Sequence, residues 1–336
     1  MKHFRLLLDS LRFVVYIFKK LHIVMFVALW PLSAIAANYP ERPVRFIVPF
    51  PPGGANDIFA RVVGEKLGEY FNQQVVIDNR PGGGGSLGAE IASKARPDGY
   101  TILLANTGPN AIDVSLRSRN SYNPVRDFSA VTQISAVPLV LAIYSGANTR
   151  TLSEFIANAK STPGQINYAS AGNGSIAHLA TELFKTQAGI ELSHVPYKGT
   201  PQALTDLIAG RVGMLFTTTV ASLPHIKSGR LRALAIADAR RSALLPDVPT
   251  MTQAGLSGFE ISAWYGIVVP AKTPQTIIAR IHGDVVKALQ STQVQQRFSE
   301  LGGVAVGSSP EEFSRFLNQE IEKWGRAVKL SGARVD

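Results

Sequence analysis

The sequence predicts an α/β fold of two lobes with a ligand cleft between them, and three observations support this. Strand-like and helical segments alternate in two separate runs along the chain. Each run contains a glycine-rich loop that joins a strand to a helix. The chain has 336 residues, which is enough for two compact domains. We expect each lobe to be a mostly parallel sheet flanked by helices, with the ligand beyond the carboxyl ends of the strands.

The first run predicts a βαβαβ unit with right-handed crossovers. Its strands are expected at residues 44–50, 75–78 and 101–105, and its helices at residues 57–71 and 86–95. Because the strands of such a unit are parallel, their carboxyl ends share one edge of the sheet. The loops at that edge are therefore candidates for ligand binding.

The second run has the same alternation and continues to the last helix. Its strands are expected at residues 140–144, 166–169, 192–195, 214–217, 231–237 and 264–269, and its helices at residues 151–160, 175–187, 201–209, 274–290 and 309–328. Thr151 and Glu154 have the spacing of a capping box. Ser309 followed by Pro310 and Glu312 is a typical helix start, so these two helix boundaries are the best defined.

We expect the last two helices to pack back on the first lobe. The chain would then cross between the lobes twice, near residues 138–141 and again near residues 238–262. This arrangement predicts lobe 1 at residues 37–137 and 250–336 and lobe 2 at residues 138–249.

The loop between the first strand and the first helix is the most informative segment. It comprises Phe50, Pro51, Pro52, Gly53, Gly54, Ala55, Asn56 and Asp57. The prolines fix φ, the glycines allow a close approach to the main chain, and Asn56 and Asp57 are residue types that cap helix N-termini. The amides and the positive dipole end of the helix would hold a carboxylate or phosphate without a Lys or Arg. An ordinary βα turn explains this stretch by itself equally well.

Two other loops at predicted strand ends are rich in small and polar residues. Asn106 and Thr107 follow the third strand of the first run. The other loop consists of Ser170, Ala171, Gly172, Asn173, Gly174 and Ser175. Either loop is compatible with a mere connection. Two glycine-rich helix entries, one in each predicted lobe, favour an anion site that the lobes share.

The N-terminal residues predict export from the cytoplasm. Residues 1–20 carry five basic residues against one acid, and the apolar run at residues 21–36 ends in Ala34-Ile35-Ala36. This is the pattern of a signal peptide at residues 1–36 with cleavage near Ala36. The apolar run is short for a membrane span and contains a proline, so an uncleaved anchor is the less favoured interpretation.

The composition excludes several classes of function. The chain has no cysteine, which removes disulfides, thiolate nucleophiles and Cys-based zinc sites. Of the formal charge of +10, the leader carries four charges, and the remaining basic residues are scattered. A nucleic-acid partner is therefore not expected. A mildly basic surface is compatible with anionic solutes.

Three motifs suggest other functions, but each lacks its usual context. Residues 83–88 match G-x-G-x-x-G, yet an Arg-Pro pair separates the glycines from the strand, so no cofactor is expected. The same glycines place Ser86 in a G-x-S-x-G pattern, which keeps a secreted serine hydrolase of α/β type as the alternative function. His178 and Glu182 have i, i+4 spacing without a third ligand in sequence, which favours a helix-surface pair over a metal site.

Ordered sequence blocks extend along nearly the whole mature chain. Three of them read IVPFPPGG at residues 47–54, NYASAGNG at residues 167–174 and HVPYKG at residues 194–199. Others lie at residues 79–85, 97–101, 204–207, 223–226, 231–235 and 245–250. Together they resemble the extracytoplasmic solute-binding proteins of tripartite tricarboxylate transporters, the Bug family.

The resemblance implies a periplasmic binding-protein fold, type II-like, that closes on a small organic carboxylate. It implies a non-enzymatic protein of the periplasm, which delivers its ligand to membrane transporter subunits or to a sensor protein. One ligand carboxylate would be held by main-chain amides and ordered water between the first loop and the loops of the opposing lobe. A monomer without metal or cofactor is expected.

Five residues complete the candidate site. His178 and Tyr197 lie beside or within the family blocks. Thr217 and Thr218 follow Phe216 where many members have an acid, so a ligand ammonium would lack a carboxylate partner and an amino acid is disfavoured. Trp264, with its neighbour Tyr265, lies on an interlobe strand, and the pair is either an aromatic wall of the site or part of the core. Whether the ligand is an aliphatic diacid or an aromatic acid stays open.

Overall fold

The computed structural model describes residues 39–335, and the fold is that of a unit that begins at Arg42. The predicted signal peptide lies outside the described residues. The described strands form one ten-stranded mixed sheet in the order β2-β1-β3-β9-β4-β7-β5-β6, with β10 and β8 both paired to β4. The strands are β1 (Val44–Val48), β2 (Val75–Asn79), β3 (Thr101–Asn106), β4 (Phe128–Tyr144), β5 (Asn167–Ser170), β6 (Ser193–Pro196), β7 (Met214–Thr218), β8 (Leu231–Ile236), β9 (Ser262–Pro270) and β10 (Val304–Ala305).

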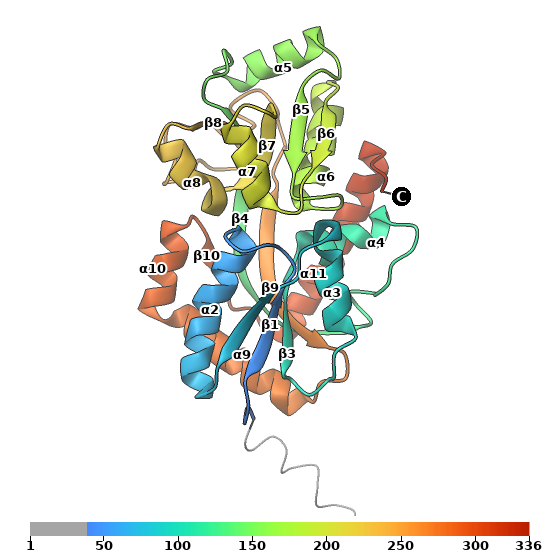
Figure 1. Ribbon diagram of the computed structural model, residues 1–336, viewed down its shortest axis with the longest axis vertical. Coiled ribbons are helices and arrows are strands. Elements are labelled where there is room, and N and C mark those ends of the chain that lie inside the picture. Colours follow the sequence, from blue (N-terminus) through green and yellow to red (C-terminus); the bar gives the residue numbers. More distant parts are fainter. Residues whose placement is uncertain (1–38, 336) are drawn as a thin grey trace, which may run out of the picture. The chain divides into compact units, whose positions relative to one another are not determined.

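Strand β4 joins the two halves of the sheet. Its residues 128–138 pair with β9, and residues 139–144 pair with β7 and β8 (Figure 1). We call the part with β1, β2, β3, β9 and β10 the first half-sheet, and the part with β5, β6, β7 and β8 the second half-sheet. The first predicted crossing is therefore the middle of one long strand, of which the sequence indicated only residues 140–144.

The return path after β8 is hydrogen-bonded to that strand. Ala237 N donates to Leu139 O over 2.8 Å, Ile261 N donates to Ala237 O over 2.9 Å, and Leu139 N donates to Ile261 O over 3.0 Å. The two connections between the half-sheets thus support each other. The lobe boundaries predicted from the sequence stay a prediction.

The expectation of mostly parallel sheets is wrong in detail. Strand β1 is parallel to β2 and β3, and β5 is parallel to β6 and β7, as the βαβ pattern predicts. Every pairing of β4 and β9 is antiparallel. The sheet is mixed because these strands connect the half-sheets instead of belonging to βαβ units.

Helices cover the faces of both half-sheets (Figure 1). They are α2 (Ala55–Phe71), α3 (Ser86–Ser93), α4 (Asp113–Leu116), α5 (Leu152–Ser161), α6 (Ile176–Ala188), α7 (Thr200–Ile208), α8 (Thr219–Lys227), α9 (Gln275–Gln290), α10 (Thr292–Glu300) and α11 (Pro310–Ser331), with short helical turns η1 (Gly83–Gly85) and η2 (Gly108–Ile112). Sequence reasoning missed α4, α8, α10 and η2. Helix α9 packs on α2 and β4, and α11 contacts β4, α4 and α6.

Two of the predicted helix starts are confirmed and one is wrong. Ser309 Oγ accepts from Glu312 N and the Glu312 carboxylate accepts from Ser309 N, which is a complete capping box. Thr151 Oγ1 accepts from Glu154 N over 3.2 Å. Helix α2 begins two residues earlier than predicted and is capped by Gly54, so Asn56 and Asp57 lie in its first turn instead of at the N-cap.

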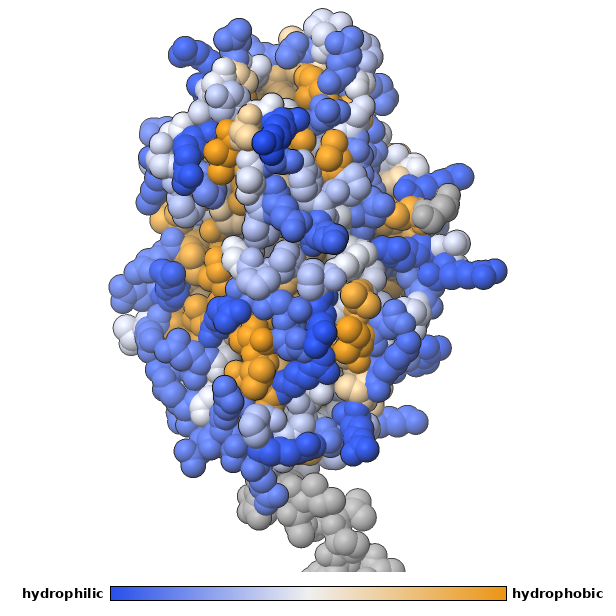
Figure 2. Space-filling view, viewed as in Figure 1, coloured by the Kyte–Doolittle hydropathy of each residue, from blue (hydrophilic) through white to orange (hydrophobic). Residues whose placement is uncertain are grey.

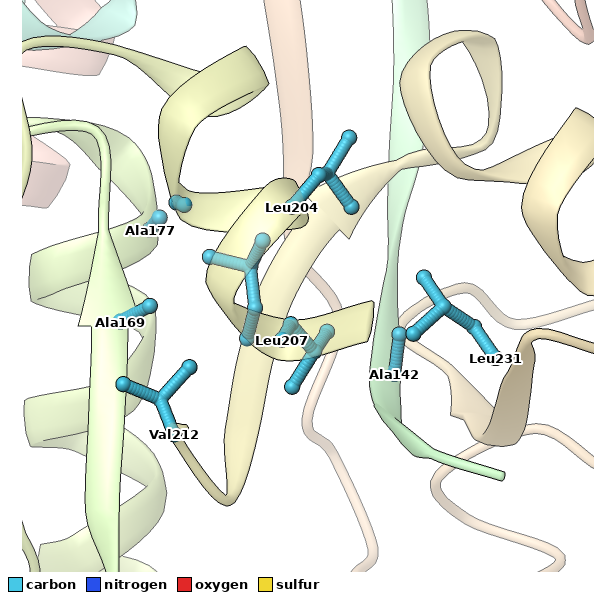
Figure 3. Packing of buried hydrophobic residues seen from close by; sticks show 9 residues of the cluster. Ala142, Ala169, Ala177, Leu204, Leu207, Val212 and Leu231 are labelled. Atoms are coloured by element: carbon cyan, nitrogen blue, oxygen red, sulfur yellow. The ribbon is translucent and has the colours of Figure 1, made fainter. Parts of the chain in front are cut away.

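The core of the second half-sheet lies between its strands and helices α6 and α7. Figure 3 shows Leu204 and Leu207 of α7 among alanine side chains from β4, β5 and α6 and Leu231 of β8. The face seen in Figure 2 is mostly hydrophilic, with small apolar patches between charged side chains. Within residues 39–335, no helix has the length and apolar character of a membrane span.

Candidate ligand-binding site

A small cavity of about 50 Å³ lies at the strand ends where the two half-sheets face each other. It holds only a few non-hydrogen atoms. Larger hollows, such as one of about 330 Å³ between α2 and α10, are lined largely by exposed polar and charged residues. The residues that line the small cavity are Phe50, Ala55, Asn56, Asn106, Thr107, Leu139, Ala171, Ser175, Ile176, Ala177, Thr200, Phe216, Thr217, Thr218, Ala263, Trp264 and Tyr265.

Helix N-termini border this cavity on several sides. The first turn of α2 contributes Ala55 and Asn56, and the N-cap and first turn of α6 contribute Ser175, Ile176 and Ala177. Helices α7 and α8 begin at the cavity as well, through Thr200, the first residue of α7, and Thr218, the N-cap of α8. First-turn amides have no acceptor within their own helix. The cavity is therefore surrounded by N–H groups and positive dipole ends, which suit an anion.

The side chains that line the cavity are neutral. Among the residues that the structure describes, no Lys, Arg, His, Asp or Glu lines it. Three lining side chains carry a buried polar atom without a hydrogen-bond partner, namely Asn56 Oδ1, Asn106 Nδ2 and Thr217 Oγ1. A buried polar atom left unpaired costs about 1–3 kcal/mol, so a ligand that pairs with these atoms recovers that free energy.

Aromatic side chains close the cavity on the side of the sheet. Trp264 and Tyr265 are 2% and 3% exposed, and both line the cavity while packing in the core. Trp264 Nε1 donates to the buried carboxylate of Glu320 over 3.0 Å, which fixes the indole ring. Tyr265 packs against Phe59 with ring centroids 4.8 Å apart. Both residues therefore belong to the core and to the cavity lining, while their contact with a ligand stays a prediction.

Asp57 supports the first loop from behind. Its carboxylate accepts from Gly53 N over 3.0 Å, from Asn79 Nδ2 over 3.0 Å and from Arg61 Nε over 2.9 Å. Burial opposes ionisation of Asp57, but these hydrogen bonds outweigh it and lower the pKa of the carboxyl group. Asp57 does not line the cavity, and neither do Pro52, Gly53 and Gly54. Gly53, with φ of 84°, uses the conformational freedom of glycine, whereas Gly54, with φ of −85°, does not.

The glycines of the third loop contact the glycine run at residues 83–85. A Cβ atom on Gly84 would lie 2.1 Å from Asn173 O, and one on Gly172 would lie 3.2 Å from Gly84 N. The backbones of η1 and of the loop at residues 170–175 therefore touch across the site. The glycine run permits this close contact.

Half of the predicted site residues line the cavity. These are Phe50, Ala55, Asn56, Asn106, Thr107, Ala171, Ser175, Thr217, Thr218 and Trp264. Those that lie behind or beside it are Pro52, Gly53, Gly54, Asp57, Ser170, Gly172, Asn173, Gly174, His178 and Tyr197. The Tyr197 hydroxyl donates to Asp206 over 2.7 Å, away from the cavity lining.

His178 and Glu182 do not form the predicted helix-surface pair. His178 is buried and stacks on His194, while Glu182 accepts from the Tyr168 hydroxyl and pairs with Lys185. The sequence carried no sign of this stack, because His178 lies on helix α6 and His194 on strand β6.

Six lining residues were missed by sequence reasoning. They are Leu139, Ile176, Ala177, Thr200, Phe216 and Ala263. Ile176, Ala177 and Thr200 carry an available signal, because each lies in the first turn of a helix that follows a glycine. Leu139 and Ala263 are ordinary strand residues, which only the pairing of β4 with β7 and with β9 brings to the site.

Ser86 lacks the partners of a catalytic serine. Its hydroxyl donates to Gly83 O over 2.7 Å and contacts the Asp113 carboxylate, with no histidine as partner. Burial raises the pKa of Asp113 to about 6, although Ser86 and Arg117 favour its charged form. Ser86 thus holds together the turn before α3, and its surroundings give the hydrolase alternative no support.

Comparison with known proteins identifies the family of this chain. Residues 59–332 match the TctC model, described as the tripartite tricarboxylate transporter family receptor. The chain is 38% identical over 306 residues to protein BugT of Bordetella pertussis, covering 91% of this chain and 93% of BugT.

Two solved structures from Rhodopseudomonas palustris are similar over their whole length. Rpa4515 with adipate has 34% identity and a TM-score of 0.86, covering 88% of this chain and 100% of that one. MatC with bound malate has 31% identity and a TM-score of 0.84, covering 86% and 100%. The chain therefore belongs to the TctC family of Bug-type receptors of tripartite tricarboxylate transporters, which are binding proteins and not enzymes.

Proposed function

We propose that this receptor binds a small organic carboxylate in the cavity between the half-sheets and delivers it to the membrane subunits of a tripartite transporter. The observation that carries the proposal is the meeting of four helix N-termini, within residues 39–335, around a cavity without charged side chains. Main-chain amides supply the hydrogen bonds, and the helix dipoles supply the positive potential.

Ligands without an ammonium group are favoured. An ammonium in this cavity would meet the positive ends of the helices and no carboxylate among the lining residues. Leaving such a charge unpaired and buried is costly. Thr217 offers only a neutral hydroxyl, whose oxygen is buried and unpartnered. Adipate and malate, found in the two similar structures, are both dicarboxylates without an amino group.

Because the cavity is small, we expect the surrounding loops to move apart when a dicarboxylate enters. The loops at residues 50–54 and 170–175 are the elements that would move, because each connects a strand to a helix at the rim. The N-terminal pattern at residues 1–36 supports export to the periplasm. A similar solved structure, described as a periplasmic transporter, supports the same location.

A thermal-shift screen on the mature protein tests the ligand class. Adipate, malate, aspartate and glutamate are compared, and a ligand at 100 times its Kd adds about 2.7 kcal/mol of apparent stability. Adipate or malate should give the larger shift, with Kd then measured by calorimetry. Arg80→Ala is the control, because Arg80 is half exposed, pairs with Asp78 and does not line the cavity. A larger shift with an amino acid would contradict the proposed class, and no shift with any acid would contradict the proposed function.

A further inference from the structure

Three aromatic rings are stacked behind the loop at residues 170–175. Tyr168 of β5, His194 of β6 and His178 of α6 lie nearly parallel. The ring centroids of Tyr168 and His194 are 4.6 Å apart at 10°, and those of His194 and His178 are 4.3 Å apart at 7°. Tyr168 is fully buried and His178 is 5% exposed. The stack therefore ties together two strands and the first turn of the helix whose N-terminus borders the cavity.

The ring nitrogens of the two histidines bond to the loop itself. His178 Nδ1 accepts from Gly174 N over 3.3 Å. His194 Nε2 bonds to Ser170 Oγ over 2.6 Å, and Ser170 Oγ accepts from Gly172 N over 3.1 Å. Both glycines have positive φ, 115° at Gly172 and 81° at Gly174, a conformation that glycine adopts without strain. Their neighbours Ala171 and Ser175 line the cavity.

The hydrogen bond from Gly174 N to His178 needs a neutral His178 ring. Nδ1 of His178 is an acceptor only when it carries no proton. Two stacked imidazolium rings would also repel each other at this distance. Burial lowers the pKa of His178, and it lowers the pKa of His194 to about 3, with His178 and Lys185 adding to the effect at His194. Burial thus favours the neutral form of both rings, which the hydrogen bond to His178 Nδ1 requires.

We propose that His178 and His194 are positioning residues, which hold the amides of Gly174 and Gly172 so that the loop keeps its binding conformation. The effect of this positioning on binding rests on the proposed function, in which a carboxylate is held at the N-terminus of α6. Neither histidine lines the cavity, and so neither contacts the ligand in this arrangement. Preorganising the loop reduces the entropy lost when ligand binds.

Amide exchange measured by NMR on protein labelled with ¹⁵N-glycine tests the positioning role without any ligand. His178→Phe and His194→Phe keep a flat ring in the stack but remove the nitrogen. His178→Asn and His194→Gln keep a polar atom near the position of Nδ1 and Nε2, respectively. We expect exchange about tenfold faster at Gly174 in His178→Phe and at Gly172 in His194→Phe, with recovery in the Asn and Gln variants.

The controls separate positioning from general destabilisation. His225→Asn changes a partly exposed histidine of α8 that is not bonded to this loop and should leave both glycine amides unchanged. If a Phe variant does not fold, the corresponding Leu variant replaces it. Unchanged exchange at Gly172 and Gly174 in folded Phe or Leu variants would overturn the inference, and so would equal acceleration of all glycines.

Titration with adipate and malate links the loop to binding. The Phe variants should bind about tenfold more weakly than the parent, and the Asn and Gln variants within about threefold of it. Faster exchange with unchanged affinity would overturn the claim that the fixed loop serves binding. If the parent binds neither acid, the proposed function fails for this ligand class, while the exchange rates still decide whether the histidines position the loop.

Discussion

Substitution of Gly84 by Ala would test the contact between the glycine run and the loop at residues 170–175. Gly84 has φ of 67°, and the added Cβ would lie 2.1 Å from Asn173 O and 3.0 Å from Ser175 N. Both atoms belong to the main chain and cannot rotate away. Gly164 is a matched control, since its φ is 72° and a Cβ there would meet nothing within 4 Å.

The two variants share one cost and differ in another. The positive φ costs an alanine about 1–2 kcal/mol at either position. Overpacking adds typically 1–3 kcal/mol, and only Gly84→Ala incurs it. We therefore expect Gly84→Ala to lower the free energy of unfolding by about 1–3 kcal/mol more than Gly164→Ala, unless the loops separate to relieve the overlap. Separation would instead move Ala171 and Ser175 away from the opposite side of the cavity.

Thermal unfolding and calorimetric titration with adipate distinguish these responses. Gly84→Ala should melt several degrees below Gly164→Ala, or melt similarly but bind about tenfold or more weakly. Gly164→Ala should keep the affinity of the parent protein. Equal melting temperatures together with equal affinities in the two variants would refute the reasoning that this backbone contact matters.

Three further predictions concern the cavity and its surroundings. Thr217→Asp should weaken adipate binding and shift preference toward aspartate in the thermal-shift screen, whereas an unchanged ranking would place the ligand away from this hydroxyl. Glu320→Ala should lower the unfolding free energy by about 2–4 kcal/mol, because two buried indole N–H groups lose their acceptor; exposed Glu322→Ala should not. Burial lowers the pKa of His194 to about 3 in the folded protein, so the unfolded chain binds one more proton below about pH 6.5. The free energy of unfolding should therefore fall as the pH is lowered from 6.5 towards 3. Urea unfolding at several pH values should show a smaller slope in His194→Gln, by the equivalent of up to one proton.

Much of the fold could be predicted because its signals are local. The βαβ units, the capping residues Ser309 and Thr151, and the glycine-rich helix entries follow from residues a few positions apart. The short helix α8 was missed because Pro224 lies inside it. The turn η2 and helix α4 were missed because Gly108 and Pro109 are typical of a turn. The family resemblance, resting on long ordered blocks, is confirmed.

The candidate site could be predicted only where its residues belong to helix entries. Asn106 and Thr217 were correctly placed at strand ends, but their unpartnered atoms became visible only when every neighbour was known. Asp57 was predicted to bind ligand because a polar side chain beside an anion-binding loop can either contact the ligand or support the loop. Its partners Arg61 and Asn79 decide that it supports the loop.

The sequence by itself determined the alternation of strands and helices, the neutral glycine-rich loops and the family, because each depends on residue types and short spacings. Only the tertiary structure decided that β4 joins both half-sheets, that Gly84 touches Asn173, and that His178 stacks on His194. These features depend on pairs of residues far apart in the chain. These contacts form only once the strand order of the sheet is established, and no local sequence pattern specifies that order.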